Sequence, residues 1–203
     1  MSTIIDKVMI DADFTMKLGK LKKYKIIENY LPQFADMIYI HEYIYKNEVL
    51  YPPLVKQQID KLIQKGQAAV VNHKYILDEK PEAADVYVDT QDLLMKNIDE
   101  SVEGHKNWGE IVSISFANAM GINYFLSDES KLQGILDEHV NVREDDGIRV
   151  FRITDFLLWM KEAGLERKII RTAWIFYENQ NDVNTEKDIE RIKKWFDTEF
   201  WPV

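Results

Sequence analysis

The sequence predicts an α/β fold with three layers, in which helices cover both faces of a mostly parallel central sheet of four to five strands, plus C-terminal helices. Two observations predict it. Short apolar segments alternate along the chain with segments whose apolar residues recur at helical spacing. Each apolar segment is also short and continuous, as is typical of strands that are covered on both faces. Such alternation favours parallel strands joined by crossover helices.

Five segments are expected to be strands, over residues 8–12, 36–40, 67–71, 122–126 and 148–153. Helices are expected between and after them, over 14–18 resuming at 22–31, 43–50, 52–66, 90–103, 109–120, 154–163, 166–177 and from 184 or 185 onward. Gly121 stands where a helix C-terminus favours glycine, and Thr185 with Asp188 forms a loose capping box. Residues 72–88 are expected to form an irregular loop, and residues 143–147 a charged turn.

The composition limits the classes of protein that the chain can represent. Its 203 residues suffice for one domain with an appendage, and the absence of cysteine excludes disulfides, thiolate nucleophiles and zinc–thiolate sites. The four histidines, His41, His73, His105 and His139, lack the spacing of a zinc site. No signal peptide and no membrane-spanning run is recognisable, so a cytoplasmic protein is expected.

The net charge of −9 argues against a broad basic face that grips nucleic acid. One short segment is an exception because it concentrates lysines, namely Lys17, Lys20, Lys22, Lys23 and Lys25. Such a run is typical of a solvated helix face. Its position beside the first strand also makes Lys17, Lys20, Lys22 and Lys23 candidate contacts for a phosphate backbone.

Four acidic residues stand where the predicted topology gathers side chains, Asp11, Glu48, Glu110 and Asp128. Two of them end the first and fourth strands, and the other two lie on helices that flank those strand ends. Clustered carboxylates repel one another unless cations lie between them, and oxygen ligands suit Mg²⁺ or Mn²⁺. The alternative is local: Asp11 and Asp128 cap helices, and Glu110 is an acid favoured at a helix N-terminus.

The order and spacing of these acids resemble the PIN-domain nucleases, which carry an acid after the first strand, one after the second and two around the fourth. The first motif is VMIDADFTMKLG, IYIHEYIYKNEVL supplies the second acid, and GEIVSISFANAMGINYFLSDES supplies the last two. The resemblance covers about residues 5–155. For the second acid, Glu42 rivals Glu48, and the third acid is Gly-Glu where the family usually has Asp.

The resemblance implies metal-dependent hydrolysis of RNA, with Mg²⁺ or Mn²⁺ held by Asp11, Glu48, Glu110 and Asp128. Asp13 and Ser127 would orient these ligands. It also implies a nuclease domain over residues 1–155, and residues 156–203 would be a helical extension packed on the same domain. RNA is the implied partner, and the additional helices are candidate surfaces for an inhibitor or antitoxin protein or for a second copy.

Two other classes remain open. The sequence DADFT also fits the DxDxT motif of haloacid dehalogenase-like phosphatases, in which Asp11 would attack phosphorus and Asp13 would act as general acid and base. That chemistry also needs a lysine, and none clearly follows a strand near Asp128. The third class is a non-catalytic interaction module that keeps the fold, against which four clustered acids argue because they cost stability without a cation.

Overall fold

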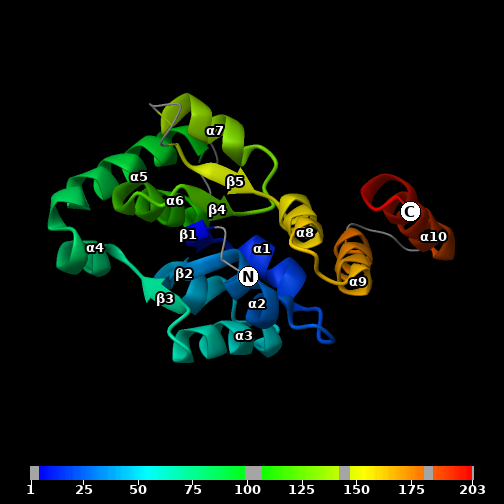
Figure 1. Ribbon diagram of the computed structural model, residues 1–203. Coiled ribbons are helices and arrows are strands. Elements are labelled where there is room, and N and C mark those ends of the chain that lie inside the picture. The colour runs from blue at the N-terminus through cyan, green and yellow to red at the C-terminus, as the bar shows by residue number, and fades with distance from the viewer. Residues whose placement is uncertain (1–4, 99–106, 142–146, 181–184, 203) are drawn as a thin grey trace.

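A single five-stranded sheet organises the structure, which is a computed structural model that describes residues 5–98, 107–141, 147–180 and 185–202. The strand order is β3-β2-β1-β4-β5, and each neighbouring pair is parallel (Figure 1). The strands are β1 (Ile5–Ile10), β2 (Ala35–His41), β3 (Ala68–Val71), β4 (Tyr124–Leu126) and β5 (Arg149–Phe151). The predicted α/β fold with a central parallel sheet is confirmed.

Helices cover both faces of the sheet (Figure 1). On one face lie α1 (Ala12–Gly19), α2 (Ile26–Phe34), α3 (Pro53–Gln64) and, further along the chain, α8 (Ile153–Glu162), α9 (Arg167–Glu178) and α10 (Glu186–Trp195). On the other face lie α4 (His73–Glu79), α5 (Ala84–Ile98), α6 (Trp108–Met120) and α7 (Leu132–His139). Three single turns complete the chain, η1 (Ile44–Glu48), η2 (Pro81–Ala83) and η3 (Phe196–Phe200).

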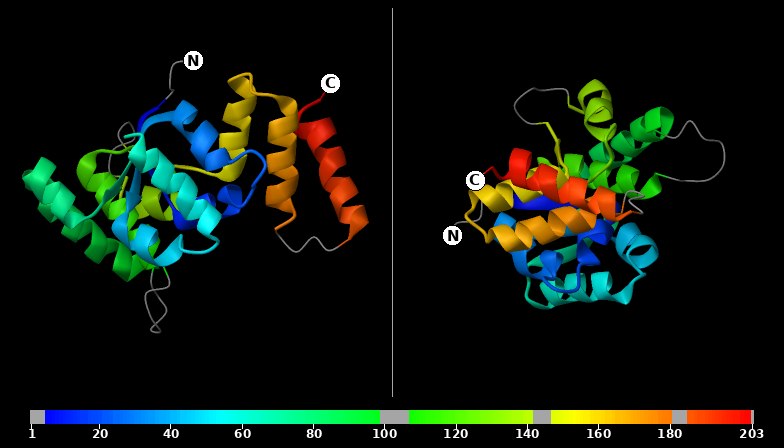
Figure 2. Two further views of the ribbon diagram at one scale, coloured as in Figure 1. Left: turned by 90° about the horizontal axis from the view of Figure 1, so that it is seen from below. Right: turned by 90° about the vertical axis from the view of Figure 1, so that its right-hand side faces the viewer.

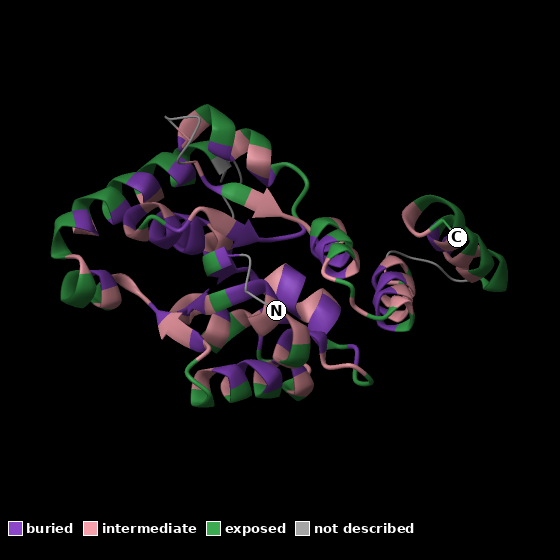
Figure 3. Ribbon diagram, in the orientation of Figure 1, coloured by how far each residue is buried: buried purple, intermediate pink, exposed green. Residues whose placement is uncertain are grey.

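The strands are buried on both sides because successive side chains point to opposite faces. In β1, Val8 and Ile10 belong to the hydrophobic cluster beneath α1 to α3, whereas Met9 belongs to the cluster beneath α4 to α7. In β4, Leu126 and Phe125 divide between the same two clusters. Burial is not continuous along the strands (Figure 3), because Asp6 and Lys7 of β1 and Asp36 of β2 are exposed. An apolar run is therefore required only toward the carboxyl ends of the central strands, such as residues 8–10 of β1.

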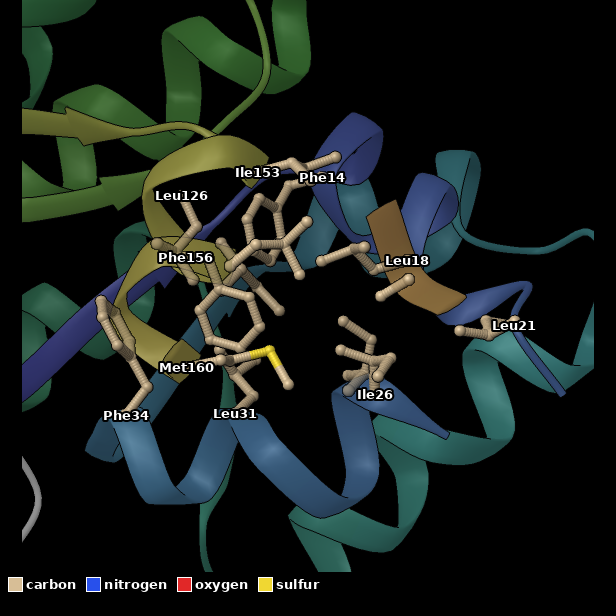
Figure 4. Packing of buried hydrophobic residues seen from close by; sticks show 14 of the residues in the cluster. Phe14, Leu18, Leu21, Ile26, Leu31, Phe34, Leu126, Ile153, Phe156 and Met160 are labelled. Carbon is tan, nitrogen blue, oxygen red and sulfur yellow. The ribbon is translucent and has the colours of Figure 1, made fainter. Parts of the chain in front are cut away.

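The C-terminal helices share the core of the sheet. Phe156 of α8 packs edge-on against Phe14 of α1, with ring centroids 5.6 Å apart, and Met160 and Phe34 close the same cluster (Figure 4). Helices α8, α9 and α10 then lie side by side (Figure 2). The boundary expected at residue 155 falls inside α8, so the extension begins within a helix of the sheet's own covering layer.

The structure corrects the expectation for residues 72–88, which follow β3. Residues 72–88 do not form an irregular loop, because they contain α4, η2 and the start of α5. The Asn72 side chain accepts a hydrogen bond from the Tyr75 amide and so caps α4. Ile76 and Tyr87 are buried, which shows that this segment has the apolar face a packed helix needs. The polar and charged residues between these positions concealed that pattern.

Several predicted boundaries also move. Helix α5 begins before Thr90, whose hydroxyl donates to the Val86 carbonyl inside the helix instead of capping it. Helix α2 continues past Pro32 to Phe34. Burial of Leu31 and Phe34 compensates for the hydrogen bond that Pro32 cannot donate. The expected helix end at 99–103, the turn at 143–146 and position 184 lie outside the described residues.

None of the helices in the described part of the chain combines the length and the apolar character needed to cross a membrane.

Candidate functional site

The candidate site begins where β1 and β4 end side by side. Ile10 pairs with Leu126, so Asp11 and Ser127 are the first residues beyond two neighbouring strands. The Asp11 amide donates to the Leu126 carbonyl at 2.9 Å, and the Ser127 hydroxyl donates to Asp11 Oδ2 at 3.1 Å. The strand register therefore fixes Asp11, and the Ser127 hydroxyl holds its carboxylate.

Asp11 also begins helix α1. Its Oδ1 accepts a hydrogen bond from the Ala12 amide at 2.7 Å, and its side chain is almost fully buried, with 1% of the residue exposed. Asp11 therefore both caps α1 and belongs to the acidic site, so these two interpretations do not exclude each other. A carboxylate with only two donors retains lone pairs that can bind a further partner.

Glu48 and Glu110 approach the same place from two other segments. Glu48 is the last residue of η1, the turn that follows β2, and Glu110 lies in the first turn of α6. The Glu48 carboxylate packs against Gly109, where a Cβ atom would lie 2.7 Å from both Oε1 and Oε2. Because Gly109 has no side chain, Glu48 can lie beside the N-terminus of α6 and next to Glu110.

Burial and neighbouring acidic residues disfavour the charged form of each of these three carboxylates. Burial raises the pKa of Asp11 well above its ordinary value, and the charges of Glu110 and Glu48 raise it further. Burial, then the charge of Glu110, raise the pKa of Glu48 to about 7. Burial also raises the pKa of Glu110, to which Glu129 and Asp13 contribute by repulsion. No lysine or arginine of the described residues forms an ion pair with any of the three carboxylates.

Asp128, the fourth predicted acid, has a different environment. It is 7% exposed, and its Oδ2 lies 2.7 Å from Lys17 Nζ. Arg152 Nη2 lies 3.4 Å from Oδ1, and the Tyr177 hydroxyl donates to the two carboxylate oxygens at 3.2 and 3.0 Å. Burial and the charge of Asp128 raise the pKa of Tyr177 to about 12, so its hydroxyl keeps the proton that it donates. The chain itself therefore compensates the charge of Asp128.

The remaining predicted residues are Asp13 and four lysines, and they differ in whether they face the acidic site or solvent. Asp13 does not hydrogen-bond to a predicted metal ligand; it pairs with Lys17 Nζ at 2.9 Å. Lys17 is consequently directed toward Asp13 and Asp128, beside the acidic cluster. Lys20, Lys22 and Lys23 are exposed in the loop that follows α1.

Glu42, the rival for the second acid, is turned to other partners. Its carboxylate accepts from Lys46 Nζ at 2.6 Å and from Asn72 Nδ2 at 3.2 Å. The structure brings Glu48, and not Glu42, next to Glu110.

Two residues of the site, Arg152 and Tyr177, were missed by the sequence analysis. Arg152 follows β5 and precedes α8, a position that the parallel topology places beside the end of β4. Tyr177 lies on α9, for which the sequence predicted a helix over residues 166–177 but no site residue. The signal for Arg152 was its place after the last strand, whereas a phenol on an apolar helix face gave no comparable signal for Tyr177.

The donor set suits a hard divalent cation, because Asp11, Glu48 and Glu110 supply carboxylate oxygens whose charge lacks compensation. In the present arrangement, no three His, Asp or Glu side chains of the described residues are close enough together to coordinate one ion. Comparisons of the chain with protein-family models, with curated proteins and with solved structures find no match.

Proposed function

We propose that the chain is a metal-dependent, PIN-like ribonuclease of the cytoplasm that hydrolyses phosphodiester bonds at the carboxyl end of its sheet. One observation carries this proposal: Asp11, Glu48 and Glu110 come from three separate segments, the pKa of each is raised by burial and by the charge of a neighbouring acid, and none of them forms an ion pair in the described chain. Burying carboxylates close together lowers the stability of the fold unless a bound cation compensates their charge, so such a group is typical of a functional site. Mg²⁺ or Mn²⁺ is the cation that suits these ligands.

Each side chain has a role in the proposed reaction. Asp11, Glu48 and Glu110 would hold the ion, and Ser127 fixes the Asp11 carboxylate through its 3.1 Å hydrogen bond. The ion, once bound, polarises the phosphate and makes water a better nucleophile at neutral pH. Lys17 and Arg152 place two positive charges at the edge of the acidic cluster, where they would attract the RNA backbone. Lys20, Lys22 and Lys23 would extend that attraction along the exposed loop.

A phosphatase is the second candidate, and one observation favours it. Lys17 Nζ lies 2.9 Å from Asp13 and 2.7 Å from Asp128, so the structure supplies the lysine that the sequence did not locate. Asp11 would then attack phosphorus, with Asp13 as general acid and base. Glu48 and Glu110 have no role in that chemistry, and for this reason the nuclease is preferred.

Asp11→Asn tests the proposal most directly. The substitution keeps the size of the side chain but removes its charge, so metal-dependent cleavage of labelled single-stranded RNA should fall about 100-fold or more. The assay compares Mg²⁺, Mn²⁺ and EDTA, and includes Asp128→Asn. Asp89→Asn is the matched control because Asp89 is exposed on α5, in the layer over the other face of the sheet from α1.

The outcomes separate the candidates. Cleavage that needs the metal and is lost only in the site variants supports the nuclease. Hydrolysis of p-nitrophenyl phosphate that disappears in Asp11→Asn, without any cleavage of RNA, would favour the phosphatase. A protein without either activity would contradict both and leave a non-catalytic module.

A further inference from the structure

A groove of about 430 Å³ lies between the C-terminal helices α8, α9 and α10. Its lining residues are Thr154, Trp174, Glu178, Arg191, Ile192 and Trp195. Tyr177 and Glu178 are consecutive on α9: the Tyr177 hydroxyl donates to Asp128, and Glu178 lines the groove. The charge of Asp128 also contributes, after burial, to the raised pKa of Glu178. This end of α9 therefore lies near both Asp128 and the groove.

Two tryptophans form an aromatic wall of this groove. The rings of Trp174 and Trp195 are stacked, with centroids 4.7 Å apart and planes inclined by 11°. Trp174 is buried, whereas Trp195 exposes 44% of its surface. Packing on Trp174 fixes the orientation of the exposed ring, so a planar ligand would meet a preorganised surface.

The polar residues of the groove differ in charge. Arg191 is exposed on α10, and its Nη2 lies 3.5 Å from Asp188 Oδ1 on the same helix. The Glu178 carboxylate makes no hydrogen bond or ion pair with another residue of the described chain. A guanidinium can bind a phosphate, and a carboxylate can accept from the amino group of a base. Aromatic, cationic and acceptor groups thus line one small space.

We propose that this groove binds one unpaired base of a single-stranded RNA whose backbone passes the acidic site. The base would pack on the indole of Trp195, and Arg191 would contact the adjacent phosphate. The inference rests on the proposed function for the identity of the ligand. A paired base cannot stack on a side chain in this way, so the groove selects single strands.

Binding measured without metal tests the inference apart from cleavage. The probe is a fluorescein-labelled single-stranded RNA of mixed sequence in EDTA, and the readout is fluorescence anisotropy. Trp195→Leu keeps an apolar side chain but removes the aromatic face, and should weaken binding about tenfold. Trp195→Phe keeps an aromatic face and should bind within about threefold of the parent protein. Blunt double-stranded RNA should bind the parent and Trp195→Leu equally. Thermal unfolding establishes that both variants fold.

The outcomes distinguish this inference from the proposed function. Equal RNA binding by Trp195→Leu and the parent would overturn the proposal that the groove binds a base, even where metal-dependent cleavage is intact. Equal losses in Trp195→Leu and Trp195→Phe also overturn base stacking. A loss confined to Trp195→Leu supports the groove, and it does so even where the parent cleaves no RNA and the nuclease proposal fails. A parent protein that binds no single-stranded RNA overturns the groove.

Discussion

The acidic site contains two regions that differ in whether the protein compensates the negative charge of the carboxylates. In the first region, formed by Asp11, Glu48 and Glu110, burial and neighbouring negative charge raise the pKa of each carboxyl group. Asp128 lies a few residues beyond the end of the adjacent strand, yet it is compensated by Lys17 at 2.7 Å, by Arg152 at 3.4 Å and by the Tyr177 hydroxyl.

The comparison teaches that the four acids need not be equivalent, although Asp11 and Asp128 both follow the ends of neighbouring strands. A carboxylate paired inside the chain has its charge satisfied whether or not an ion binds. A carboxylate crowded by like charges is stabilised only by a proton or by an added cation. We therefore expect the first three acids to respond strongly to metal, and Asp128 to respond mainly to changes in Lys17, Arg152 and Tyr177.

Of the substitutions that test this difference between the two regions, Gly109→Ala should have the largest effect. The new Cβ would lie 2.7 Å from both carboxylate oxygens of Glu48, so the flexible side chain of Glu48 must move away from Glu110. Affinity for Mn²⁺ should fall about 10- to 100-fold, as is common when the support of a ligand is lost. Calorimetric titration of the purified variant with Mn²⁺ measures the change.

Gly134→Ala is the matched control. Gly134 also lies in a helix, α7, but a Cβ there meets no atom within 4 Å. This substitution should leave metal affinity unchanged and raise the free energy of unfolding by about 0.5–1 kcal/mol, because alanine is the better helix former. Equal affinity for Mn²⁺ in Gly109→Ala and the parent would remove Glu48 from the ion-binding group.

A smaller effect is expected where the chain supplies its own cation. Lys17→Met keeps the length of the side chain but leaves Asp128 with only Arg152 and Tyr177 as partners. The free energy of unfolding should fall by about 2 kcal/mol, less than for a buried acid that loses every partner. Urea denaturation measures it, and Lys46→Met is the control.

The control pair is exposed and should therefore contribute little. Lys46 lies 2.6 Å from Glu42, but most of the lysine side chain is in solvent, so its loss should change stability by less than about 0.5 kcal/mol. Equal stability of Lys17→Met and Lys46→Met would show that Asp128 does not depend on an internal cation, and the distinction between the two regions would disappear.

Much of the fold could be predicted because its signals are local. The five apolar segments became the five strands, and Gly121 ends α6 with a positive φ of 68°, as its place after Met120 indicated. Residues 72–88 were predicted wrongly because their helices are short and mostly exposed, and only residues such as Ile76 and Tyr87 reach the core. Single buried positions are too sparse to reveal a helical period.

The candidate site could be predicted only in part, for a physical reason of the same kind. Strand ends locate Asp11 and Ser127, since parallel neighbours bring them together whatever their side chains do. The direction of Lys17 and the hydroxyl contact of Tyr177 depend on how α1 and α9 pack across more than a hundred residues of chain. Spacing along the sequence contains no such information.

The smallest expected effect is a dependence of stability on pH that separates the two regions. Glu48 has a pKa of about 7 in the folded protein, above that of an unfolded glutamate. The folded state therefore binds more protons between about pH 4.5 and 7, and the free energy of unfolding of the metal-free protein should fall as pH rises through that range. The decrease should be on the order of 1 kcal/mol, since solvent screens the half-exposed carboxylate.

Thermal unfolding in EDTA at several pH values measures this slope, and Glu48→Gln should flatten it because glutamine does not titrate. Mg²⁺ should raise the unfolding temperature more at pH 8 than at pH 5, since the ion competes with protons for the same oxygens. The Lys17→Met protein should keep the slope, because Lys17 compensates Asp128 and not the three crowded acids. A metal-free protein that becomes more stable from pH 5 to pH 7, or a slope as steep in Glu48→Gln as in the parent, would show that Glu48 does not determine the response.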